Sequence, residues 1–70
     1  MGAKYSAVIQ QHGDWWIGWI EEVPGVNSQG RNREELLENL QDALEEALEM
    51  NRADARAAAG GVFEEVSIPA

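Results

Sequence analysis

The stretch EVPGVNSQG at residues 22–30 has the residue types of a phosphate-binding loop, with two glycines among small polar side chains. Such a loop leads its glycines into the first turn of a helix, often with a lysine. The spacing of Gly25 and Gly30 fits neither the P-loop nor the dinucleotide-binding motif, and no lysine follows. Pro24 and Gly25 suit the middle of a turn, and Gly30 lets the chain leave a strand. We interpret the stretch as a connection between strands.

His12 and Asp14 are the next residues with catalytic potential, because a histidine beside a carboxylate can act as a general base. Both fall in QHGD, a hairpin-turn sequence in which Gly13 accepts a positive φ. No serine or cysteine nucleophile lies close by, so we interpret His12 as a solvated turn residue. The chain has no cysteine and one histidine, which does not suffice for a common zinc site. We expect no cofactor and no metal site.

The charge of the chain limits its partners. Thirteen acidic and five basic residues give a formal net charge of −8, and the basic residues are scattered. Nucleic-acid-binding proteins carry a basic stripe that neutralises phosphates, so we expect no direct nucleic-acid binding. The same charge repels an anionic membrane surface and steers a basic protein partner into contact. No segment approaches the length of a membrane span or secretion signal, and we expect a cytoplasmic protein.

Two strands joined by the hairpin are expected at residues 4–10 and 15–21. The first alternates in polarity, and the second is rich in aromatic and β-branched residues. A loop of even length sets which side chains share a face. One face then holds Tyr5, Ala7, Ile9, Trp16, Gly18 and Ile20. The other face holds Val8, Trp15, Ile17 and Trp19.

The second strand is apolar on both faces, and one helix covers only one of them. We call Val8, Trp15, Ile17 and Trp19 the Trp face. Either the Ala-rich residues 51–60 pack over it, or it is an interface with a second copy or a partner, where tryptophan is enriched. We favour the interface, because a 70-residue domain without disulfides or a structural metal buries little surface by itself. We therefore expect a homo-oligomer, dimer or tetramer.

A long helix is expected from residue 31 to about residue 50, since leucine and alanine recur there with a helical period. Asn32 is the expected N-cap, with Glu35 three residues on in a variant capping box. The outer side carries Glu38, Asp42 and Glu45, which we call the acidic stripe. It is either a solvated face or a docking surface for a basic partner. Residues 51–60 continue the helix or form a second one, and 62–68 alternate like a strand.

The run WIGWIEEVPGVNSQGRNREELLENLQDALEEAL resembles the HicB-like antitoxin pattern, in which an aromatic strand, a Pro-Gly turn, a strand ending in Gln-Gly, a helix cap and Glu-Glu follow one another. The matching residues are Val23-Pro24-Gly25, Ser28-Gln29-Gly30, Asn32 and Glu34-Glu35. The resemblance covers roughly residues 4–50. It implies one α+β domain over residues 1–70 with a partial ribonuclease H-like fold: a three-stranded antiparallel sheet, one long helix on one face, and a further strand beside the first (β-β-β-α-β).

The resemblance also implies a function. Such an antitoxin neutralises a small basic toxin that cleaves mRNA, by covering the RNA-binding and active surface of the toxin. The ribonuclease H-like fold raises a nuclease hypothesis, but the first strand contains no acid to join Glu35, Glu38 and Glu64 in a two-metal site. We therefore expect no enzyme. Many family members continue into a DNA-binding domain that is not evident here. The alternative is a stand-alone homo-oligomeric interaction or regulatory module without a toxin.

Overall fold

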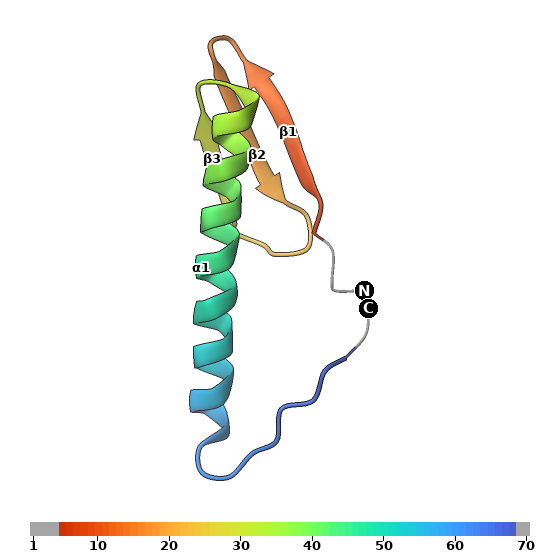
Figure 1. The fold of residues 1–70 in the computed structure, drawn as a ribbon, viewed down its shortest axis with the longest axis vertical. Coiled ribbons are helices and arrows are strands. Elements are labelled where there is room, and N and C mark those ends of the chain that lie inside the picture. Colours follow the sequence, from red (N-terminus) through yellow and green to blue (C-terminus); the bar gives the residue numbers. More distant parts are fainter. Residues whose placement is uncertain (1–4, 69–70) are drawn as a thin grey trace.

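The computed structural model describes residues 5–68. It contains β1 (Ala7–His12), β2 (Trp15–Ile20), β3 (Asn27–Gly30) and α1 (Arg33–Ala59), in that order. The strands form one antiparallel sheet in the order β1-β2-β3, and α1 lies against one face of it (Figure 1). The predicted α+β class, with a three-stranded antiparallel sheet and one long helix on one face, is confirmed.

Two glycine turns set the connections of the sheet. Gly13 has a φ of 59° between β1 and β2, and Asp14 after it has a negative φ, as in a two-residue type II′ hairpin. Gly25 has a φ of 89°, the left-handed conformation expected of the residue after Pro24 in its turn. Turns are present at both predicted places, but the first comprises residues 13 and 14 alone, and His12, predicted as a turn residue, is the last residue of β1.

The register of the sheet gives the predicted division of side chains. Ile9 pairs with Gly18, and Gly18 with Ser28, so this row points to the helix side. The neighbouring row pairs Val8 with Trp19, and it points to the opposite side because successive strand residues alternate. The two faces predicted from an even loop length are confirmed.

A small core lies between α1 and the sheet. Its four buried side chains are Ile20, Val26, Leu36 and Leu40. Half-buried apolar side chains surround them, namely Ile9, Trp16, Val23, Ala43, Leu44 and Ala47. The core is therefore small, as expected for a domain of 70 residues.

Helix α1 starts as the sequence predicts. Asn32 is the N-cap, and its side-chain oxygen accepts a hydrogen bond from the Glu35 backbone N–H at 2.8 Å. The Glu35 carboxylate accepts from the backbone N–H of Arg31 at 3.0 Å, one residue before the cap. Gly30 is needed because a Cβ atom there would lie 2.6 Å from the Leu36 backbone nitrogen.

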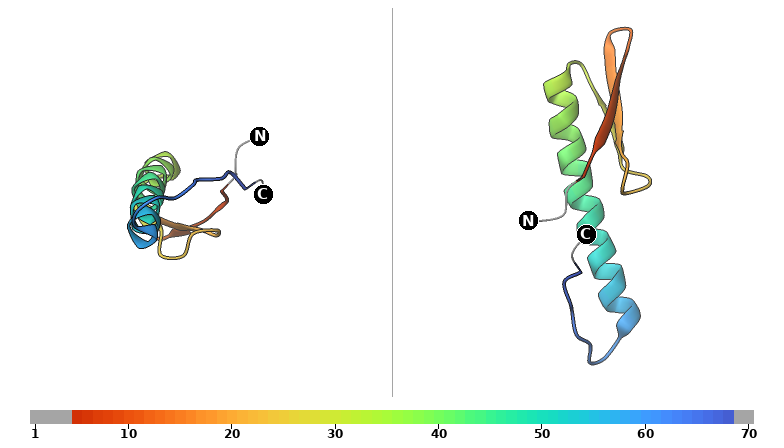
Figure 2. Two further views of the ribbon diagram at one scale, coloured as in Figure 1. Left: turned by 90° about the horizontal axis from the view of Figure 1, so that it is seen from below. Right: turned by 90° about the vertical axis from the view of Figure 1, so that its right-hand side faces the viewer.

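Helix α1 extends far beyond the sheet (Figures 1 and 2). Its 27 residues span about 40 Å, whereas the residues that pack on the core end at Ala47. Residues 51–59 continue the same helix and are exposed. The alternative in which residues 51–60 pack over the Trp face is therefore wrong, because an unbroken helix carries them away from the sheet.

The 62–68 segment, predicted as a strand beside the first, has no regular secondary structure. It follows Gly60 and Gly61, both with positive φ, and runs back along α1 (Figure 1). The described sheet has three strands, and this segment is not one of them. The predicted fourth strand is not formed within the chain because the uninterrupted helix ends too far from β1.

Candidate protein-binding face

The Trp face is the side of the sheet opposite α1, and nothing in the described chain covers it. Trp15 and Trp19 are 44% and 40% exposed, while Val8 and Ile17 are half-buried. Trp15, Ile17 and Trp19 lie in one line along the central strand β2, because they alternate with residues that point to the helix. The structure thus brings together the four residues predicted from the sequence as an interface.

Polar side chains border this apolar line on both neighbouring strands. Across from Trp19, the register places Val8 on β1 and Asn27 on β3, and across from Ile17 it places Gln10 and Gln29. An apolar centre with a polar rim is the usual composition of a protein–protein interface.

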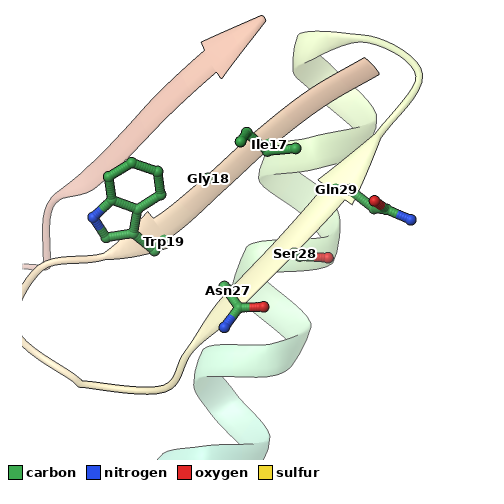
Figure 3. A pocket seen from close by; sticks show the side chains of 6 residues that line it. All are labelled: Ile17, Gly18, Trp19, Asn27, Ser28 and Gln29. Carbon is green, nitrogen blue, oxygen red and sulfur yellow. The ribbon is translucent and has the colours of Figure 1, made fainter. Parts of the chain in front are cut away.

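A pocket of about 390 Å³ lies on this face between β2 and β3 (Figure 3). Ile17 and Trp19 form its apolar part, and Asn27 and Gln29 supply side-chain amides on the opposite strand. Its other lining residues are Gly18 and Ser28. Its lining thus combines apolar surface with amide groups that can donate and accept hydrogen bonds.

The far end of the Trp face carries a positive charge that the sequence reasoning missed. The Arg31 guanidinium lies 5.9 Å from the centre of the Trp15 ring, within the range of a cation–π contact. His12 pairs with Trp15 across β1 and β2, and its Nε2 lies 3.2 Å from Gln10 Oε1. Strand alternation could have placed His12 and Gln10 on this face, but no sequence signal predicted the position of Arg31.

The acidic stripe does not lie near the Trp face. Glu38, Asp42 and Glu45 are exposed, and Glu38 stands about 200° round the helix from the buried Leu36. These carboxylates therefore point away from the sheet, while the Trp face points away from the helix. A partner of compact shape contacts one surface or the other, and not both at once.

The two edges of the sheet differ in how open they are. On β3, the side-chain amide of Asn39 donates a hydrogen bond of 2.8 Å to the backbone carbonyl of Gln29. Helix α1 packs over β2 and β3 and does not lie over β1. The β1 edge therefore remains open to a further strand, and β3 is partly covered by the helix.

One ion pair joins the end of α1 to the 62–68 segment. Arg56 Nε donates to Glu65 Oε1 at 2.5 Å, and both side chains are largely exposed. This hydrogen bond and the charge of Arg56 lower the pKa of Glu65 below its ordinary value. The same contact raises the pKa of Arg56. The pair is the contact that joins this exposed segment to the end of the helix.

The described residues also lack the features of two other kinds of site. Within residues 5–68, no group of three or more His, Asp or Glu side chains is placed to hold a metal ion. In the same part of the chain, no helix combines the length and the apolar character that a bilayer span requires.

Comparison of the chain with known proteins gives no matching family model, no matching curated protein and no matching solved structure. The HicB-like resemblance therefore stays a prediction from the motif residues.

Proposed function

We propose that this protein is a HicB-like antitoxin that binds a small basic mRNA-cleaving toxin through the Trp face. The motif residues behind this proposal have defined structural roles here. Pro24-Gly25 forms the turn before β3, Gly30 ends β3 against the helix, and Asn32 caps α1. The proposal includes the partial ribonuclease H-like fold, whose fourth strand beside β1 is not formed within the described single chain.

The observation that carries the proposal is the uncovered Trp face. Two tryptophans at least 40% exposed, on one strand with Ile17 between them, form an apolar surface that water solvates poorly. Tryptophan is enriched among the residues that contribute most to binding energy at interfaces. The 390 Å³ pocket beside Trp19 gives this surface a recess for a partner side chain.

The charge of the chain has a separate role in the proposal. Because Glu38, Asp42 and Glu45 point away from the Trp face, they do not contact a toxin bound there. A net charge of −8 still attracts a basic protein over a distance and raises its association rate. The Trp face supplies the contact, and the acidic stripe supplies attraction that salt screens.

Inhibition in this scheme needs no chemistry by the antitoxin, which is not an enzyme. The bound chain occupies the surface on which the toxin holds RNA, and its negative charge repels the phosphates that compete for that surface. Affinity then depends on how slowly the apolar contact dissociates, whereas ionic strength acts mainly on the association rate.

The test is to mix the pure protein with the product of the adjacent gene and to measure the mass of the complex by light scattering. A heterocomplex whose formation blocks RNA cleavage supports the proposal. Trp19→Ala is expected to weaken binding by tenfold or more, mainly through faster dissociation. Phe63→Ala serves as the matched control, because Phe63 is 48% exposed but lies off the Trp face. Equal binding by wild type and Trp19→Ala would contradict the assigned face.

The acidic stripe has its own test within the same assay. Glu38→Gln, Asp42→Asn and Glu45→Gln together should slow association at low salt and leave dissociation nearly unchanged. An accelerated dissociation instead would assign the direct contact to the helix.

The second candidate is a stand-alone homo-oligomeric module without a toxin. The small core of four buried side chains favours self-association in either case. An adjacent gene that encodes no short Lys/Arg-rich protein, together with a pure protein that oligomerises and ignores its neighbour, would favour this module over the antitoxin.

A further inference from the structure

The 62–68 segment has the pattern of a strand that lacks a partner. Val66 and Ile68 alternate with the polar Ser67 and are 65% and 82% exposed, and Val62 at the start of the segment is 104% exposed. These β-branched side chains favour extended backbone and gain free energy when they leave water. A run of this kind, left in solvent in a single chain, is a candidate for pairing with an open sheet edge.

The chain's own β1 lies out of reach of most of this segment. The helix residues after Ala47, up to Ala59, carry the chain about 18 Å past the core. Extended chain advances about 3.3 Å per residue, so residues 61–66 are used in returning to the level of the sheet. Within the 62–68 segment, Ser67 and Ile68 are then left to pair with a strand of six residues.

The edge of β1 offers the required backbone groups. Ser6 accepts a hydrogen bond from the Glu21 backbone N–H at 2.9 Å, so Ser6 faces β2. Bonding direction alternates along an antiparallel strand, and the N–H and C=O groups of Ala7, Ile9 and Gln11 therefore point outward. These groups have no strand partner in the described structure.

An apolar flank of α1 faces the β1 side of the molecule without lying over β1 itself. Leu44 and Leu48 are half-buried and stand roughly opposite Asn39 round the helix, and Asn39 faces the β3 edge. Leu44 and Leu48 therefore face the β1 side, where no strand lies beneath them. A strand added to β1 would place every second side chain on the helix side of the sheet, toward this flank.

We propose that two copies of the chain exchange their 62–68 segments, each segment adding as a fourth strand to β1 of the other copy. Val66 and Ile68 then face the Leu44 and Leu48 flank of that copy. Helix α1 runs opposite to β1, and the 62–68 segment runs opposite to α1 (Figure 1). With the two helices antiparallel about a twofold axis, each segment runs antiparallel to the other copy's β1, the more frequent kind of pairing.

The lengths of the parts agree with this arrangement. The part of α1 beyond Ala47 measures about 18 Å, and the six residues of β1 measure about 20 Å. The part of α1 beyond Ala47 in one copy is thus about as long as β1 of the other copy. It can run alongside that strand and bring the 62–68 segment to its edge. The exchange leaves the Trp face free, so self-association and partner binding use different surfaces.

The first experiment measures mass by light scattering for the pure protein and three variants. Wild type is expected to be a dimer, and Val66→Glu/Ile68→Glu a monomer with unchanged helix content. Ser67→Glu alters the opposite face of the same strand and should remain dimeric, as should Trp19→Ala. A monomeric wild type, or a dimer that Trp19→Ala dissociates and Val66→Glu/Ile68→Glu does not, would overturn the proposal. No toxin is needed, so this result is independent of the antitoxin function.

The second experiment tests exchange between chains. The protein has no cysteine, so single cysteines can be introduced cleanly. Chains carrying Gln10→Cys and chains carrying Ser67→Cys are mixed and treated with a short bismaleimide, since both positions lie on the same face of the proposed four-stranded sheet. A covalent pair of one chain of each kind is expected. Its absence, in a mixture where wild type is dimeric, would contradict the exchange.

Discussion

The side-chain amide of Asn39 donates a hydrogen bond of 2.8 Å to the backbone carbonyl of Gln29. This contact ties the second turn of α1 to the outer edge of β3. It holds the helix over β2 and β3 and leaves β1 without a covering element. This polar contact adds to the apolar packing that places α1 over β2 and β3.

Removal of this contact should lower stability and leave the fold intact. Asn39→Ala loses one side-chain to backbone hydrogen bond, so the free energy of unfolding is expected to fall by about 1 kcal/mol. Urea denaturation followed by circular dichroism measures the change. The adjacent Glu38→Ala is the matched control, because Glu38 is exposed and should alter stability by less than about 0.5 kcal/mol. Equal losses in both variants would contradict the role of Asn39.

Two glycines should not tolerate a methyl group. A Cβ atom at Gly18 would lie 2.9 Å from both Ile9 Cγ2 and the Val8 backbone oxygen, so Gly18→Ala is expected to cost about 1–3 kcal/mol. At Gly30 the closest atom is the Leu36 backbone nitrogen at 2.6 Å, which cannot move without disturbing the start of the helix. Thermal unfolding should therefore rank Gly30→Ala as the more harmful change. The reverse order would show that the helix start is adaptable.

The N-cap should be replaceable only by another hydrogen-bond acceptor. Asn32→Ala removes the acceptor of the Glu35 N–H and is expected to cost about 1 kcal/mol. Asn32→Asp keeps an oxygen at this position and adds a negative charge at the positive helix end, so it should be neutral or stabilising. Denaturation midpoints of the two variants provide the comparison. A loss with aspartate as large as with alanine would rule out the cap as the cause.

The Arg56–Glu65 pair should respond to pH in one direction. Because the hydrogen bond from Arg56 lowers the pKa of Glu65, the pair contributes above the pKa that Glu65 has in the unfolded chain. The contribution is lost as the pH falls through the lowered pKa of the folded form. Carboxyl NMR titration should give a low pKa for Glu65 that returns toward its ordinary value in Arg56→Gln. Arg52→Gln is the control, since Arg52 has the smallest influence on this pKa.

The secondary structure up to residue 50 was predictable because each element has a local cause. The Gly13 turn sets an even loop length, the loop length sets the register, and the register sets which residues share a face. The Trp face follows from this chain of reasoning without any knowledge of the tertiary contacts. The N-cap likewise depends only on Asn32 and the residue three positions later.

Other features depend on distances that a sequence pattern does not contain. The alternation of residues 62–68 favours a strand, but pairing depends on where the helix ends, and no proline or glycine interrupts α1 before Gly60. The separation of the acidic stripe from the Trp face follows from which side of the sheet α1 occupies. The contact of Arg31 with Trp15 arises at the junction of β3 and α1, where no periodic pattern applies.

The alternation of the three tryptophans along β2 makes their optical signals separable. Trp16 lies against the helix and is half-buried, whereas Trp15 and Trp19 are exposed on the other face. Indole emission shifts with the polarity around the ring, so Trp16 reports the docking of α1 while Trp15 and Trp19 report whatever covers the sheet. The protein thus carries intrinsic fluorophores for both events, and a Trp16→Phe variant would isolate the emission of the outer pair.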